Sequence, residues 1–114
     1  FLLVRHKYFE QMGCRLSDHG MEEFYADDFT NAELDAIFSK VYGGSVLTEA
    51  EIRKFKSAML IEFGKMDADT GWTQQFHYGV IRNQNSKMFK LIGKDTGFDS
   101  MSQVMTAKAM NRCL

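Results

Sequence analysis

The chain has 114 residues, which is enough for one small domain and too few for two. Its formal net charge is −1, from 14 Lys and Arg residues against 15 Asp and Glu residues, so charge gives no argument for a nucleic acid or a membrane as partner. The apolar runs are far too short to cross a bilayer, and the N-terminus lacks the pattern of a signal peptide. We therefore expect a cytoplasmic protein in which Cys14 and Cys113 are reduced thiols, with a disulfide between them as the alternative.

The first predicted element is a helix over residues 1–12, where apolar residues recur at helical spacing. Gly13 is a typical residue to end it. The helical pattern is already present at residue 1 without a cap, and another stops at Leu114 without a C-terminal signal. These two features predict that the chain is a piece of a longer protein.

A short strand is predicted next, because polar and apolar residues alternate over residues 14–17. Asp18, His19 and Gly20 come directly after it, and Asp beside Gly favours turns. We therefore expect the chain to turn at these three residues.

Two helices follow and form a helical hairpin at about residues 30–66. Each begins at a capping box, the first made by Thr30 with Glu33 and the second by Thr48 with Glu51. Apolar residues follow each box at helical spacing, and a glycine pair separates the helices. The connection is too short to be a linker between domains.

A second strand is predicted over residues 73–81, which are rich in β-favouring side chains. A polar loop from Asn83, a short segment at 88–92 and a closing helix over 104–114 complete the chain. This order of elements is typical of consecutive units of a parallel α/β fold, in which the hairpin serves as the crossover between two parallel strands. We expect residues 1–114 to form a single segment.

Two groups of polar residues stand where α/β folds carry their sites, just past the C-terminal ends of the strands. In the first group, residues 17–20, Asp18 suits a general base or a group that orients a base, and equally suits a turn or a helix N-cap. In the second, His77 is a candidate site residue, and equally suits a packed core histidine. Arg82 suits bidentate binding of a carboxylate or phosphate, and also a structural salt bridge.

Three further residues have plainer interpretations. His19 is interpreted as a loop histidine, His6 as a surface or packing residue on a helix, and Trp72 as a packing residue at the entrance of the second strand. The sequence contains no pattern for nucleophilic catalysis, no phosphate-binding loop and no zinc cluster.

Three stretches, GCRLSDHG, GWTQQFHYGVIRNQNSKMFKLIGKDTGFDS and TAKAM, resemble the uronate isomerase family, also called glucuronate isomerase, in their order and spacing. The resemblance covers most of the chain and is weakest in the helical hairpin. It implies membership of the amidohydrolase superfamily and a (β/α)8 TIM barrel, of the kind found in metal-dependent hydrolases, with inserted helices. It also implies an aldose–ketose isomerisation in carbohydrate metabolism, between D-glucuronate and D-fructuronate or between D-galacturonate and D-tagaturonate.

The same resemblance implies roles for individual residues. Asp18 would end the fifth barrel strand and His77 the sixth, both as catalytic residues, and Arg82 would bind the substrate. His19 matches the motif without an implied direct role. The parent family binds a divalent metal, usually zinc, mainly through a His-x-His after its first strand and an aspartate at its eighth. These main ligands are absent from this chain, so no metal ligand is assigned here.

A whole barrel takes about 250 residues, so this chain would supply only a middle portion of one. Two strands alone leave sheet edges and apolar helix faces uncovered, which predicts a mostly helical chain that self-associates as a homo-oligomer. The full enzyme would bind a uronic acid, whereas the isolated chain is expected to be inactive. The alternatives are a non-catalytic assembly module and a sugar-acid-binding module that uses Arg82.

Overall fold

The computed structural model describes residues 1–103 and 106–113. In chain order these residues form α1 (Leu2–Gln11), β1 (Leu16–Met21), α2 (Asn31–Tyr42), α3 (Glu49–Thr70), β2 (Thr73–Tyr78), β3 (Val80–Ile81), α4 (Ser86–Ile92), β4 (Ser100–Met101) and α5 (Ala107–Cys113). The chain is thus a mixed α/β segment with more helix than strand. No helix within the described ranges is both long and apolar enough to cross a membrane.

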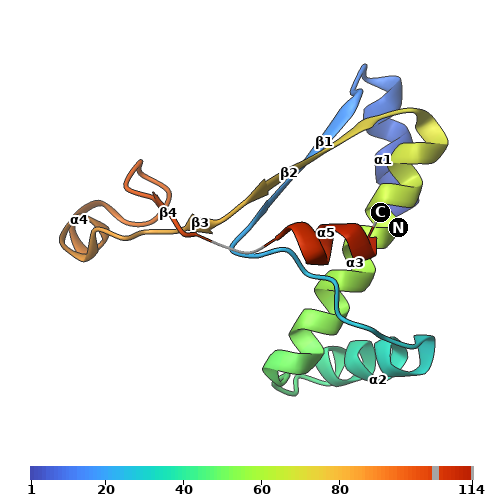
Figure 1. The fold of residues 1–114 in the computed structure, drawn as a ribbon, viewed down its shortest axis with the longest axis horizontal. Coiled ribbons are helices and arrows are strands. Elements are labelled where there is room, and N and C mark those ends of the chain that lie inside the picture. Colours follow the sequence, from blue (N-terminus) through green and yellow to red (C-terminus); the bar gives the residue numbers. More distant parts are fainter. Residues whose placement is uncertain (104–105, 114) are drawn as a thin grey trace.

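The two longer strands, β1 and β2, lie side by side and run parallel (Figure 1). Their register pairs Leu16 with Thr73 at one end and Met21 with Tyr78 at the other. The chain between them passes through α2 and α3, and α3 packs against one face of the pair. The prediction of two parallel strands joined by a helical crossover is therefore confirmed.

Both capping boxes predicted for the helical hairpin are present. The Thr30 and Thr48 side chains accept the backbone N–H groups of Glu33 and Glu51, and each glutamate accepts the N–H of its threonine. The two helices are joined by an ion pair between Lys40 and Glu51 and by another between Lys54 and Glu33. The second helix continues beyond the predicted end near Met66 to Thr70, where Gly71 ends it in the left-handed conformation with φ 72°.

The prediction for the first strand is wrong in its bounds. The strand covers residues 16–21 instead of 14–17, and Asp18, His19 and Gly20 lie inside it instead of forming a turn. The turn preference of these residues is a local effect. It is outweighed by a continuous ladder of backbone pairing with β2 and by burial of alternate side chains against α3.

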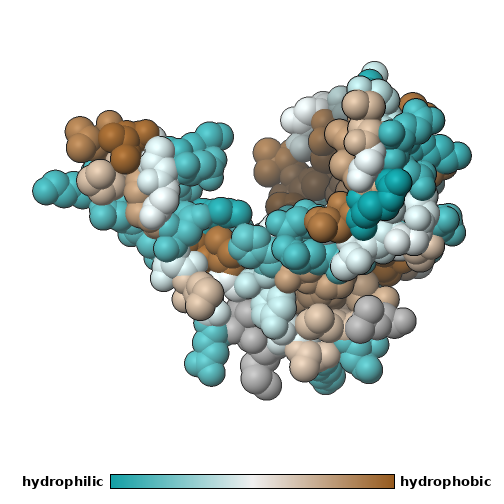
Figure 2. All heavy atoms as spheres, turned by 90° about the horizontal axis from the view of Figure 1, so that it is seen from above, coloured by the Kyte–Doolittle hydropathy of each residue, from teal (hydrophilic) through white to brown (hydrophobic). Residues whose placement is uncertain are grey.

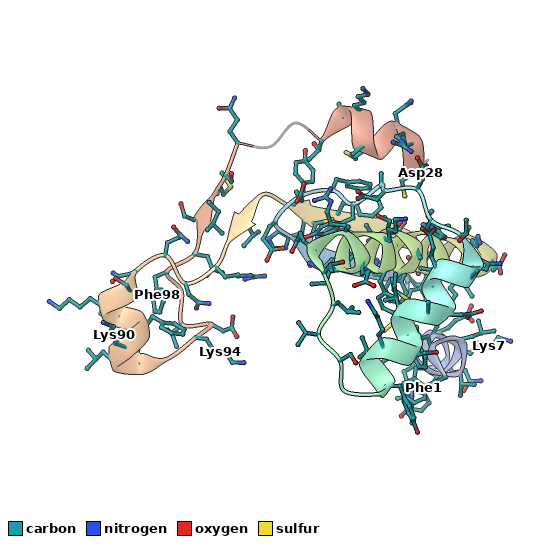
Figure 3. The ribbon with its side chains drawn as sticks, turned by 90° about the horizontal axis from the view of Figure 1, so that it is seen from below. Phe1, Lys7, Asp28, Lys90, Lys94 and Phe98 are labelled. Atoms are coloured by element: carbon teal, nitrogen blue, oxygen red, sulfur yellow. The ribbon has the colours of Figure 1, made fainter. Side chains whose placement is uncertain are left out.

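The second strand is also corrected, because it is not continuous over 73–81. Gly79 interrupts it with φ 81°, and the chain then forms β3, which pairs antiparallel with β4. The strands β3 and β4 and the helix α4 make a lobe, residues 80–101, that extends away from the rest of the molecule (Figure 1). Figure 3 shows Lys90, Lys94 and Phe98 in this lobe. The segment predicted at 88–92 belongs to α4, whereas β4 was not predicted.

The helix predicted over 104–114 is present as α5, and residues 104, 105 and 114 lie outside the described ranges. An ion pair between Arg112 and Asp28 links α5 to the segment that follows β1 (Figure 3). Cys113 in α5 and Cys14 are both free thiols, and burial raises the pKa of Cys113.

The buried core is formed by the end of β1, the segment that follows it and α3. It consists of Met21, Phe24, Tyr25 and Leu60, and Phe76 of β2 packs against it. Outside this core many large apolar side chains are exposed, over both the lobe and the body (Figure 2). Helix α1 has no buried residue. Apolar faces are thus uncovered as predicted, while the expected self-association stays a prediction.

Candidate functional site

The candidate site lies on the face of the strand pair that is turned away from α3. Side chains alternate between the two faces of a strand, so Asp18 and Gly20 of β1 share this face with Gln75 and His77 of β2. The parallel register places Asp18 opposite Gln75 and Gly20 opposite His77. The structure therefore brings together Asp18 and His77, which the sequence predicted separately. Both lie inside their strands and not past the strand ends.

Two polar side chains, those of Gln75 and His77, lie around the Asp18 carboxylate. Gln75 Nε2 donates a hydrogen bond to Oδ1 at 3.1 Å, and His77 Nδ1 lies 3.6 Å from Oδ2. The second distance exceeds that of an ordinary hydrogen bond, so the interaction is an ion pair when the imidazole is protonated. Asp18 and His77 are about half exposed, at 46% and 49%, which leaves both accessible to a ligand.

Arg82 reaches this face from the lobe. Its Nη2 atom lies 3.3 Å from the position that a Cβ atom would occupy at Gly20, so the guanidinium approaches the backbone of β1 where only glycine leaves full room. The N–H of Gly79 donates to the Met21 carbonyl at 3.0 Å, so the lobe begins beside the end of β1. The guanidinium therefore lies next to the strand position that is paired with His77.

The salt-bridge interpretation of Arg82 also holds, because Nη1 donates to Asp99 Oδ2 at 2.6 Å. The other oxygen of Asp99 accepts the backbone N–H of Asn83 at 2.9 Å. This backbone hydrogen bond, and secondarily Arg82, holds the pKa of Asp99 below its usual value. A guanidinium has five N–H donors. Within the described ranges Asp99 is the hydrogen-bond partner of its side chain, so further donors remain for a ligand.

A second polar network lies on the opposite face of the sheet, against α3. Asp67 of α3 is only 2% exposed, and its two oxygens interact with Ser17 Oγ at 2.5 Å and His6 Nε2 at 2.9 Å. Ser17 Oγ also lies 3.1 Å from His19 Nε2, and the His6 ring stacks on Trp72 at 4.0 Å between centroids. The network connects α1, β1, α3 and Trp72, which directly precedes β2.

This network corrects the roles expected for two residues. His19 is not a loop histidine, because it lies inside β1 and stacks on Phe63 of α3, and burial lowers its pKa. Ser17 belongs to the network and not to the site face. His6 packs as expected, and in addition binds Asp67. Sequence reasoning missed Asp67, although the apolar stripe of its helix continues from Phe63 directly onto it, and a charged residue in such a stripe indicates a buried polar contact.

The site residues do not form a complete metal site by themselves. Asp18 and His77 supply one carboxylate and one imidazole, and the described residues contain no group of three His, Cys, Asp or Glu side chains that could hold an ion. A resident metal would need ligands from outside this segment.

A parallel strand pair that carries a carboxylate and an imidazole on one face, joined by a helical crossover, makes this chain a segment of an α/β protein. The family model described as glucuronate isomerase matches residues 1–114. The chain therefore belongs to the glucuronate isomerase family, whose members are also named uronate isomerases.

Individual relatives agree with this assignment. The chain is 67% identical to the uronate isomerase of Bacteroides thetaiotaomicron over 113 residues, which are 99% of this chain and 24% of that protein. It is 50% identical to the uronate isomerase of Cellvibrio japonicus, again over 99% of this chain and 24% of that protein. The crystal structure of uronate isomerase from Thermotoga maritima superposes with a TM-score of 0.87 at 32% identity, covering 96% of this chain and 25% of that chain. The chain thus spans about a quarter of the length of the relatives that it matches.

Proposed function

We propose that this chain is the part of a uronate isomerase that contributes Asp18, His77 and Arg82 to the active site. The observation that carries the proposal is their convergence. Asp18 and His77 lie 3.6 Å apart on one sheet face, and the Arg82 guanidinium lies against Gly20, the residue paired with His77. The family membership supplies the substrate class, a uronic acid such as D-glucuronate or D-galacturonate.

The chemistry needs a base, a group that polarises oxygen and a clamp for the carboxylate. Isomerisation of an aldose to a ketose removes the proton from C2, forms an enediol, and returns a proton to C1. A carboxylate held in place, as Asp18 is by Gln75, suits the base that takes the C2 proton. His77 suits the exchange of protons with the O1 and O2 oxygens, and Arg82 suits the distal carboxylate of the sugar acid.

The full protein would complete what this segment lacks. In the proposed (β/α)8 barrel, β1 and β2 are the fifth and sixth strands, and neighbouring strands pair with the edges that β1 and β2 leave unpaired within the described ranges. The proposed zinc ion would be held mainly by residues outside this chain, and it would polarise the sugar oxygens when bound. The isolated chain is accordingly expected to be inactive.

A chimera tests the proposal. Residues 1–114 replace the matching segment of the Bacteroides thetaiotaomicron enzyme, and isomerisation of D-glucuronate is measured. We expect turnover that depends on Asp18, His77 and Arg82, so that Asp18→Asn and His77→Asn each lower kcat by about 10²–10⁴-fold. Asp35→Asn on α2, an exposed residue far from the site, is the matched control. A folded chimera without turnover, or an Asp18→Asn variant as active as the control, would contradict the proposal. Turnover by the isolated chain with zinc would instead contradict its expected inactivity.

A further inference from the structure

We propose that Asp99 and Gly20 are positioning residues for Arg82, and that together they set the orientation in which its guanidinium meets the substrate carboxylate. This inference rests on the proposed function, because it assigns Arg82 to the carboxylate of a sugar acid. Asp99 and Gly20 would not contact the reacting carbons of the substrate. Both would act through Arg82.

The antiparallel pairing in the lobe explains why Asp99 faces Arg82. Ile81 of β3 is paired with Ser100 of β4, so the next residue along one strand meets the previous residue of the other. These are Arg82 and Asp99, whose side chains form a hydrogen-bonded ion pair at 2.6 Å. A cross-strand pair of opposite charge at the end of a ladder fixes the direction of both side chains.

Asp99 is itself held in place. One oxygen binds the guanidinium and the other accepts the Asn83 backbone N–H at 2.9 Å, so neither oxygen is free to rotate away. These two hydrogen bonds, the one from the backbone most, lower the pKa of Asp99, as expected for a carboxylate whose charged form is bound by two donors. A charged and fixed acceptor is what a positioning residue for an arginine requires.

Gly20 is the second residue that we infer to restrict the position of the Arg82 guanidinium. A Cβ atom at this position would stand 3.3 Å from Nη2, closer than ordinary van der Waals contact. The backbone of Gly20 is in regular strand conformation and pairs with His77, so a turn does not explain the glycine. The close approach of Arg82 does explain it.

The contacts of the guanidinium place it near the C-terminal end of β1. Its Nη2 atom lies 3.3 Å from the Cβ position of Gly20, and its Nη1 atom donates to Asp99 of the lobe at 2.6 Å. A carboxylate ligand that approached this end would meet donors whose direction is already set, which lowers the entropic cost of binding.

The proposal and simple charge repulsion predict opposite effects of Asp99→Asn on the KM for D-glucuronate. If Asp99 only repelled a substrate carboxylate, Asp99→Asn would lower KM. If Asp99 positions Arg82, the same change raises KM for D-glucuronate roughly tenfold, while kcat changes by less than about threefold. Asp95→Asn is the matched control, because it removes the same charge from the same lobe and the Asp95 side chain makes no hydrogen bond within the described ranges.

The test is made in the active chimera. Asp99→Asn, Asp95→Asn, Gly20→Ala, Arg82→Ala and the double variants with Arg82→Ala are compared by kcat and KM. We expect Gly20→Ala and Asp99→Asn to raise KM in the presence of Arg82 and to have no further effect in the Arg82→Ala background. Additive effects, or a KM for Asp99→Asn equal to or below that of Asp95→Asn, would overturn the proposal. If Asp99→Asn fails to fold, the double-mutant cycle of Gly20→Ala with Arg82→Ala tests the proposal by itself. A chimera without any turnover would count against the proposed function and not against this step.

Discussion

Replacing the buried carboxylate of Asp67 should destabilise the chain far more than replacing any exposed acid of the same helix. Asp67 is 2% exposed and binds Ser17 Oγ at 2.5 Å and His6 Nε2 at 2.9 Å. Hydrogen bonds to a charged group contribute about 1.5–3 kcal/mol each, and a partner left buried without an acceptor adds a penalty. Asp67→Ala removes the contacts to Ser17 and to His6. We therefore expect the free energy of unfolding to fall by about 3–5 kcal/mol, the range for breaking a buried pair.

The assay is urea unfolding followed by far-ultraviolet circular dichroism, with Asp69→Ala on the exposed side of α3 as the control. Asp67→Asn keeps one acceptor oxygen and nearly the same shape, and should lose about half as much as Asp67→Ala. The control should change the free energy of unfolding by no more than about 0.5 kcal/mol. An Asp67→Ala variant that matches the control would refute the idea that this network holds α1, β1 and α3 together.

The buried histidine, the helix cap and the exposed apolar faces each give a further prediction. Burial lowers the pKa of His19 from 6.5, so its contribution to the free energy of unfolding is complete above pH 6.5 and is lost as the pH falls through the pKa of the folded state. His19→Gln should therefore flatten the pH dependence of the free energy of unfolding between pH 6.5 and about 4.5, where the carboxylates begin to titrate. Gly71 ends α3 with φ 72°, and Gly71→Ala should lower the free energy of unfolding by about 1 kcal/mol, measured in the same urea assay; no change would contradict the left-handed cap. The exposed apolar faces, including Phe1 at 90% and Leu91 at 73%, predict that the isolated chain self-associates, and a clean monomer in size-exclusion chromatography at low micromolar concentration would count against this.

The helices could be predicted from sequence because their signals are local. A capping box needs only a threonine and a glutamate three residues later, and both boxes at Thr30 and Thr48 are present in the structure. The parallel pairing of two strands was also predictable, since a helical hairpin stood between two strand patterns.

The details of the first strand could not be predicted in this way. Asp18, His19 and Gly20 have the local chemistry of a turn, but pairing with a strand more than fifty residues away keeps them extended. The same distance hid the contact of Gln75 with Asp18, which depends on register and not on composition. Gly20 looked like a turn residue and is instead the space for the Arg82 guanidinium.

The candidate site was predicted in its members and not in its geometry. The residue types and the family resemblance pointed to Asp18, His77 and Arg82. The contact of Asp99 with Arg82, in contrast, depends on the antiparallel pairing of β3 with β4. Two-residue strands leave almost no pattern in a sequence, so this partner of Arg82 could not be recognised before the structure was known.

The most direct test of the central claim is the turnover of D-glucuronate by the chimera that carries residues 1–114, measured with and without Asp18→Asn. We expect the unmodified chimera to isomerise the substrate, and Asp18→Asn to lower kcat by about 10²–10⁴-fold while Asp35→Asn leaves it unchanged. Equal kcat values for the Asp18→Asn and Asp35→Asn chimeras would contradict the assignment of Asp18, and with it the claim that this sheet face is part of a uronate isomerase active site.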